Sequence, residues 1–302
     1  MTAASWTDRL DGGTAAAVRA LLAAAGEADG VAPVSEAAVL SLADSDAGAR
    51  HLVSRHGDEP VGYANLVPAH GDHPAMAEVA VAPSARGRGI GAALVTQVLA
   101  EGGPGARVWA HGDLPAAKAV AGRLGLRTAR ELWQMRRPLA TPELPELAVP
   151  DGIVLRTYRG PDDDAELLRV NNAAFDWHPE QGGWTERDIA TRRAAEWFDP
   201  AGLFVATDAA DPERLLGFHW TKVHTDEQPP VGEVYVVGID PAAQGRGLGR
   251  LLTLAGLHHL RARGLGEVLL YTEADNTAAV RTYTRLGFAP AHIDVAYAAP
   301  VA

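Results

Sequence analysis

The chain has 302 residues, a length that suits two domains of about 150 residues better than one. Hydrophobic residues make up 47% and charged residues 22%, as in soluble globular proteins, and the formal net charge of -11 argues against a general nucleic-acid binder. Cysteine is absent, which excludes disulfides and a thiolate nucleophile.

We do not expect the N-terminal segment to be a signal peptide. Met1 to Leu10 contains Trp6, Asp8 and Arg9 and lacks the apolar run of a signal peptide. No stretch approaches the roughly 20 apolar residues that a membrane-spanning helix needs. We therefore expect a cytoplasmic protein that binds neither membranes nor nucleic acid.

The predicted elements follow the same order in each half of the chain. A helix-rich start leads to a strand, then to a second, apolar strand, a Gly-rich turn and an amphipathic helix. A further strand and a helix with a Leu-Gly ending close the half. Alternation of this kind predicts an α/β domain with a mixed (α+β) sheet. The predicted strands lie at residues 60–66, 79–81 and 107–110, and at 215–221, 234–239 and 268–271.

The two halves also match residue by residue. Pro83 and Pro241 head the two Gly-rich segments and are 158 residues apart. Gly125 and Gly287 close the final helices and are 162 residues apart. Two ordered matches at nearly one spacing indicate a duplicated domain, and this spacing is too long for a solenoid. The Pro-rich stretch between them predicts a stiff linker. The predicted division is a domain at 1–140, a linker at 141–150 and a domain at 151–302.

The Gly-rich segment from Gln244 to Gly249 predicts a phosphate site. Alternating glycines let successive backbone N–H groups converge, and the helix that follows adds unpaired donors at its N-terminus. Arg246 and Arg250 supply positive charge nearby. A P-loop is excluded because neither copy has Lys-Ser or Lys-Thr after its last glycine. A dinucleotide fingerprint fits the first copy by chance but not the second.

Both copies contain Arg/Gln-x-x-Gly-x-Gly after a strand, which resembles the acetyl-CoA loop of the GNAT acetyltransferase superfamily. The second copy adds a downstream pattern of Asn276, Ala279, Tyr283, Gly287 and Phe288. The resemblance implies two tandem GNAT domains and acetyl-CoA as co-substrate. It also implies that the strand before each loop splays from its neighbour, pairs with the pantetheine arm and offers an N–H to the thioester oxyanion.

By this resemblance, acetyl-CoA is bound by the following residues. In the second copy they are Val237, Gly238, Ile239, Gln244, Gly245, Arg246, Gly247, Leu248, Gly249, Arg250, Asn276 and Arg281. In the first copy they are Val79, Ala80, Val81, Arg86, Gly87, Arg88, Gly89, Ile90 and Gly91.

Amine acetylation needs a base for the ammonium and an acid for the departing thiolate. Tyr283 lies where the superfamily places its acid, and Glu233 enters the strand before the loop, a position suited to the base. The repeat spacing sets Ala121 and Ala75 at the corresponding positions of the first copy. We therefore predict catalysis in the second copy only. The alternatives are that Tyr283 is a core aromatic and Glu233 an ordinary strand-entry carboxylate.

Strings at 171–184, 217–222 and 232–238 resemble the branch of the superfamily that acetylates the cysteinyl amine of a cysteine–glucosamine–inositol pseudo-disaccharide. The implied substrate contacts are Glu36, Glu180, Lys222, Glu233 and Tyr271. Two rival functions stay open: acetylation of another small amine, and a non-catalytic acetyl-CoA sensor. We expect a monomer, because two fused modules can mimic a dimer.

The histidines do not predict a metal site. His258 and His259 are adjacent and would face different directions on a helix. His219 lies on a predicted strand and His224 at its exit, without a Cys or carboxylate pattern of metal-ligand spacing. We expect all four to be ordinary core or surface residues.

Overall fold

The computed structural model describes residues 6–43, 48–71, 73–176, 181–225 and 227–300. The chain forms two compact units. Unit 1 comprises Met1–Leu132 and His292–Ala302, and unit 2 comprises Trp133–Ala291. Within the described residues, no helix has the length and apolar character that crossing a membrane requires.

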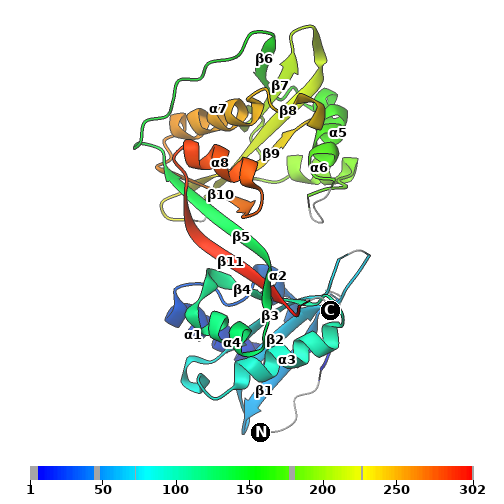
Figure 1. Cartoon of the computed structure of the whole chain (residues 1–302), viewed down its shortest axis with the longest axis vertical. Helices are drawn as coiled ribbons and strands as arrows, with labels where there is room; N and C mark the ends of the chain where they lie inside the picture. Colours follow the sequence, from blue (N-terminus) through cyan, green and yellow to red (C-terminus); the bar gives the residue numbers. More distant parts are fainter. Residues whose placement is uncertain (1–5, 44–47, 72, 177–180, 226, 301–302) are drawn as a thin grey trace. The chain divides into compact units, whose positions relative to one another are not determined.

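Unit 1 is built around a mixed sheet with strand order β1-β2-β3-β4-β11 (Figure 1). Neighbouring strands are antiparallel except β3 and β4, which are parallel. Its strands are β1 (Arg50–His56), β2 (Glu59–Val67), β3 (Met76–Val81) and β4 (Arg107–Ala110), with part of β11 (Ala289–Ala298). Its helices are α1 (Gly12–Asp29), α2 (Glu36–Ser41), α3 (Ile90–Gly102) and α4 (Pro115–Arg123), with short 3-10 turns at Pro83–Ala85 and His111–Asp113.

Unit 2 repeats this arrangement with strand order β10-β9-β8-β7-β6, in which only β9 and β10 are parallel. The strands are β6 (Ile153–Thr157), β7 (Leu203–Asp208), β8 (Asp211–His224), β9 (Val231–Ile239) and β10 (Glu267–Glu273). The helices are α5 (Asp164–Ala174), α6 (Glu186–Arg193), α7 (Leu248–Ala262) and α8 (Thr277–Arg285). Short 3-10 turns lie at Pro161–Asp163, Pro200–Gly202 and Pro241–Ala243. The predicted α/β class with a mixed sheet is confirmed.

Two strands contribute residues to both units. The unit boundaries at 132/133 and 291/292 fall inside β5 (Arg127–Pro138) and β11. In unit 1, β11 pairs with β4 from Val295↔Ala110 to Ala298↔Arg107. The sequence-based division gave all of 151–302 to the second domain, whereas the structure groups residues 292–302 with the first unit. Strand partners so distant in sequence leave no trace in a repeat pattern.

In unit 1, helices bury their apolar stripes against both faces of the sheet. On one face, Leu94 and Val98 of α3 pack into a cluster with Leu66 and Val108. On the other face, α1 packs against Tyr63, which is fully buried. Alternate residues of each strand therefore pack into two separate hydrophobic clusters, one on each face of the sheet.

Unit 2 has the same two layers. Leu257 of α7 packs with Val234 and Val268, and Leu167 of α5 packs with Trp220 on the opposite face. The helices α7 and α8 thus cover one face of the sheet, and α5 and α6 cover the other. This second face carries the polar residues described below.

Candidate active site

The Gly-rich loops of the two units have the same backbone. After its 3-10 turn, each loop places glycines at φ +75° and +82° in unit 1 (Gly87, Gly89) and at +79° and +76° in unit 2 (Gly245, Gly247). Residues with a side chain rarely adopt this left-handed backbone conformation, so glycine is required at these positions. The second glycine of each pair is the N-cap of α3 or α7, and neither cap is filled by a side chain. The free N–H groups of the first helical turn therefore face the loop.

The strand before each loop separates from its parallel neighbour. Pairing of β3 with β4 ends at Glu78↔Trp109, although β3 continues to Val81. Pairing of β9 with β10 ends at Val234↔Leu270, although β9 continues to Ile239. The backbone of 79–81 and of 237–239 is therefore open on one side to an extended ligand. This splay agrees with the expectation from the sequence.

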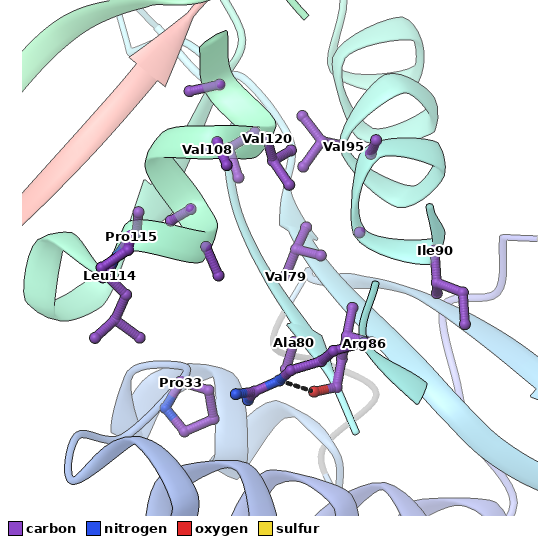
Figure 2. Close-up of a pocket in the computed structure, with 18 of the residues that line it drawn as sticks. Pro33, Val79, Ala80, Arg86, Ile90, Val95, Val108, Leu114, Pro115 and Val120 are labelled. Atoms are coloured by element: carbon purple, nitrogen blue, oxygen red, sulfur yellow. Dashed lines mark hydrogen bonds between the residues drawn. The ribbon is translucent and has the colours of Figure 1, made fainter. Parts of the chain in front are cut away.

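A cavity of about 660 Å³ opens where β3 and β4 diverge in unit 1. Figure 2 shows Leu114 and Pro115 of the α4 segment on one side, Ile90 of α3 on the other, and Val79 and Ala80 between them. Eight of the nine residues predicted for the first copy line it, namely Val79, Ala80, Val81, Arg86, Gly87, Gly89, Ile90 and Gly91. The ninth, Arg88, does not line it and donates to the carbonyl of Ser84.

The loop arginines have partners within the protein. In unit 1, Arg86 makes a two-pronged ion pair with Asp29 at 2.7 and 2.8 Å, and its Nε donates to the Val81 carbonyl. In unit 2, Arg246 lies 3.6 Å from Asp208 and is exposed. The backbone N–H groups of each loop are thus the donors left open to an anion, and Arg246 adds an exposed positive charge in unit 2.

Glu233 of β9 is 7% exposed, and its Oε2 lies 2.8 Å from Nε2 of His224. The strand register explains why Glu233 lies on the face of the sheet that α5 and α6 cover. Trp220 of β8 pairs with Val236 and Thr221 with Val234, so Tyr235 is an extra, bulged residue. Bulges re-aim side chains near active sites.

The bulge shows that the sequence-based alignment of Glu233 with the first copy was shifted by one residue. The first unit has no irregularity in the corresponding pair of strands, where Val67 faces Met76. Since Lys222 faces Glu233 in unit 2, Met76 occupies the place of Glu233 and Val67 that of Lys222. The uniform spacing had placed Ala75 there. Either residue leaves unit 1 without a base at this position.

Tyr283 is the seventh residue of α8, as Ala121 is the seventh residue of α4. Asn276 caps α8 through its side chain, while Leu114 stands at the cap of α4 without such a bond. Burial raises the pKa of Tyr283 to about 12, so its phenol stays protonated at neutral pH. Its ring meets Phe288 edge-on at 5.8 Å, and within the described residues its hydroxyl has no hydrogen-bond partner.

Lys222 extends over two aromatic rings. Its Nζ lies 5.2 Å from the ring centre of Trp197 and 5.7 Å from that of Tyr235. Tyr235 is fixed in turn by Arg192, whose Nε donates to its hydroxyl at 3.1 Å. Cation–π contacts of this kind hold an ammonium in place without neutralising it. Sequence reasoning missed Trp197 and Tyr235, since nothing in the local pattern connects them to Lys222.

The other predicted substrate residues are placed as follows. Tyr271 of β10 is half exposed, and its hydroxyl accepts a hydrogen bond from Gln134 at 2.8 Å. Glu36 is the exposed first residue of α2 in unit 1. Glu180 lies outside the described residues. The structure therefore brings Lys222 and Glu233 together on paired strands of unit 2, with Tyr271 on the next strand.

Comparisons with known proteins place this geometry in a family. The model of the acetyltransferase (GNAT) family matches residues 17–125 and again 170–288. The chain belongs to the GNAT acetyltransferase family. It is an N-acetyltransferase with two GNAT copies, as the sequence predicted, and enzymes of this family use acetyl-CoA.

Relatives of this GNAT protein extend over nearly its whole length. It is 83% identical over 294 residues to the mycothiol acetyltransferase of Nocardia farcinica, covering 97% of both chains. The mycothiol acetyltransferase of Rhodococcus jostii is 68% identical over 298 residues, again with 97% of both chains covered.

Two solved structures share its fold. One is a GCN5-related N-acetyltransferase from Sphaerobacter thermophilus, with a TM-score of 0.70 and 24% identity over 97% of this chain and 94% of that one. The other is a tandem GNAT protein from the clavulanic acid biosynthesis pathway, with a TM-score of 0.66 and 21% identity over 98% of each chain. Both bear on the fold alone.

The first GNAT copy has a buried carboxylate of its own, Glu78 of β3. Its two oxygens accept from the backbone N–H and the hydroxyl of Ser35 at 2.9 and 3.0 Å, and His111 Nε2 lies 2.8 Å away. The other nitrogen of His111 lies 3.2 Å from Asp294 of β11. Glu78 is therefore fully engaged in holding elements together.

No group of three or more potential ligands able to hold a metal ion occurs among the residues that the structure describes. Of the histidines set aside on sequence grounds, His219 donates from Nδ1 to the Leu252 carbonyl and His258 donates from Nε2 to the Pro145 carbonyl. His224 differs from them because its partner is Glu233. The signal was present in the sequence, since His224 stands two residues after Lys222 and so shares its face of the strand.

Proposed function

We propose that this protein transfers the acetyl group of acetyl-CoA to the cysteinyl amine of cysteinyl-glucosaminyl-inositol, giving mycothiol, and that unit 2 does the chemistry. The observation that carries the catalytic assignment is the contrast between the two copies. Glu233, Lys222 and Tyr283 of unit 2 stand where unit 1 has Met76, Val67 and Ala121. The substrate is supported by the names and high identity of the relatives.

In the proposed reaction Glu233 accepts a proton from the substrate ammonium, directly or through a water molecule. The N–H bond breaks, an O–H bond forms on the carboxylate, and the nitrogen lone pair attacks the thioester carbon. Open backbone N–H groups of β9 near Val237 are suited to stabilise the oxyanion. As the carbon–sulfur bond breaks, the phenol of Tyr283, which its raised pKa keeps protonated, gives its proton to the thiolate. The nitrogen loses its second proton to water as the amide forms, and the phenolate regains a proton from water.

The substrate carries many hydroxyls and one ammonium, and the residues predicted to bind it match that chemistry. Lys222 offers a fixed donor to hydroxyl oxygens, Tyr271 offers a phenol, and Glu233 attracts the ammonium. We include Glu36 and Glu180 in the proposed substrate site on the resemblance alone.

We further propose that both copies bind acetyl-CoA but that only the second turns it over. The unit 1 cavity has the splayed strand, the glycine loop and mostly apolar walls that suit a pantetheine arm with its pyrophosphate. The same backbone recurs in unit 2 at Val237–Ile239 and Gln244–Arg250, with Asn276 and Arg281 on α8. In this proposal, the protein groups alone bind acetyl-CoA, without a metal ion.

The test is the release of CoA from acetyl-CoA together with the mass of the product, for the pseudo-disaccharide and for a panel of simple amines. We expect kcat/KM for the pseudo-disaccharide to exceed that for the other amines by at least about 100-fold, because several polar contacts favour it. Equal turnover of a simple amine would keep the mechanism and reject the substrate. Binding of acetyl-CoA without turnover of any amine would favour the sensor.

A further inference from the structure

The carboxylate of Glu233 has a single hydrogen-bond partner among the described residues, and that partner is His224. The Oε2–Nε2 distance is 2.8 Å. A carboxylate only accepts hydrogen bonds, so Nε2 of the imidazole carries the shared hydrogen. The Glu233 side chain is 10% exposed, whereas the His224 side chain is 23% exposed.

The neighbouring cation does not share this role. Lys222 faces Glu233 directly across the two strands, yet no ion pair forms between them. The ammonium is held over Trp197 and Tyr235 instead. The orientation of Glu233 therefore depends on the histidine, which comes from the same face of β8 two residues further on.

The two oxygens of Glu233 are consequently inequivalent. Oε2 is tied to His224, and Oε1 accepts no hydrogen bond from any residue that the structure describes. Unit 1 offers the opposite case, because both oxygens of Glu78 are already occupied by Ser35 and His111. A base needs an accessible oxygen for the proton that it accepts, and of the two carboxylates only Glu233 keeps an oxygen that accepts no hydrogen bond from a described residue.

We propose that His224 is a positioning residue for the acetyl-transfer reaction: it fixes Oε2 of Glu233 so that Oε1 is presented to the substrate ammonium. The inference rests on the proposed function of unit 2. When Oε1 takes the proton, the N–H bond of the ammonium breaks and the O–H bond forms, while the bond to His224 stays in place. Misplacement of a reacting group by about 1 Å costs on the order of 100-fold in rate, so loss of this anchor should be visible in kcat.

The experiment compares His224→Leu with His224→Gln in the full chain. Leucine removes the donor, and kcat should fall about 10- to 100-fold with KM for acetyl-CoA unchanged. Glutamine keeps an N–H donor at similar reach and should restore most of the lost rate. His56→Leu removes an exposed strand-end histidine of unit 1 and should match the parent. Thermal unfolding and acetyl-CoA binding establish that each variant is folded.

A double-mutant cycle with Glu233→Gln tests whether His224 influences the rate through Glu233. If His224 acts through Glu233, adding His224→Leu to Glu233→Gln should slow the reaction no further. An equal additional loss in both backgrounds, or a glutamine variant as slow as the leucine variant, would overturn the inference. Parental activity of His224→Leu beside an inactive Glu233→Gln would overturn it alone, whereas parental activity of Glu233→Gln would remove the proposed function as well.

Discussion

At the scale of single residues, burial determines the protonation state of Tyr283, the acid of the proposed reaction. Tyr283 has no charged neighbour that accounts for its behaviour; burial alone raises its pKa to about 12. A neutral phenol beside a departing thiolate is a proton donor, and a phenolate in the same place would repel it. The position of Tyr283 on α8 thus supplies the protonation state as well as the location.

The variant Tyr283→Phe keeps the ring and its edge-on contact with Phe288 while removing the proton. We expect kcat to fall by about 100-fold or more, with acetyl-CoA affinity and thermal stability close to those of the parent. Steady-state kinetics beside calorimetric titration of acetyl-CoA measures both. A phenylalanine variant with parental kcat would make Tyr283 a core aromatic, the alternative that the sequence left open.

Lys222 lends itself to an internal control, because the chain has only one other lysine, Lys118. Lys118 is exposed, pairs with Asp113 and lies outside the cavity lining. We expect Lys222→Met to raise KM for the pseudo-disaccharide about tenfold or more through loss of a charged donor, with little change in KM for acetyl-CoA. Lys118→Met should behave as the parent. Equal KM values in the two variants would show that Lys222 is an ordinary strand charge.

Residue positions could be predicted from sequence where the backbone is regular. Tyr283 falls on Ala121 in the structure, as the repeat spacing predicted, because the two helices are equal in length. The residue of unit 1 that corresponds to Glu233 was misassigned by one position, because the bulge at Tyr235 changes the strand register and has no sequence signature. The His224 contact required knowledge of which strands pair.

At the scale of elements, we propose that each Gly-rich loop binds acetyl-CoA together with the helix that follows it. Gly87 and Gly245 have positive φ values and no atom within 4 Å of a Cβ placed on them. A substitution there strains the backbone without causing a clash. This makes the two loops a matched pair for assigning acetyl-CoA to each copy.

We expect Gly245→Val to lose most turnover, because a β-branched residue at this φ costs roughly 1–2 kcal/mol and turns the N–H groups away from the pyrophosphate. Gly87→Val should keep turnover and lose the acetyl-CoA that binds to unit 1. Calorimetric stoichiometry and CoA release, measured on both variants, separate the two sites. Loss of turnover in Gly87→Val with full activity of Gly245→Val would reverse the assignment of the copies.

The order of elements could be predicted because helix and strand periodicities differ and repeat. The strand partners could not. Residues 292–302 group with unit 1 through the pairing of β11 with β4, a contact between segments more than 180 residues apart in the chain. No local pattern encodes the partner of a strand that contacts a sheet formed so much earlier in the sequence.

At the scale of the whole molecule, each unit has a histidine with a shifted pKa, and the two shifts have opposite directions. In unit 1, burial opposes the charge on His111, but the hydrogen bonds and charges of Asp294 and Glu78 outweigh it and raise its pKa to about 9. In unit 2, burial lowers the pKa of His219 to about 4. An unfolded histidine titrates near 6.5, so each group links protonation to folding.

We expect His111 to stabilise unit 1 fully below about pH 6.5, with the contribution lost as the pH rises through 9. The contribution of His219 runs the other way: unit 2 loses stability as the pH falls from about 6.5 through 4, because unfolding takes up a proton. Unfolding midpoints of the parent, His111→Gln and His219→Gln across pH 4–9 test both signs. A His111→Gln variant that keeps the alkaline slope of the parent would contradict the role of the Glu78–His111–Asp294 cluster.

We propose that unit 2 catalyses acetyl transfer with Glu233 as base. The most direct test is kcat for the pseudo-disaccharide in the Glu233→Gln variant at saturating acetyl-CoA, since glutamine keeps the shape and removes the proton acceptor. We expect a loss of about 100- to 10,000-fold with acetyl-CoA still bound. A variant that binds acetyl-CoA and turns over at the rate of the parent would contradict the claim and leave the chemistry of this protein to another residue.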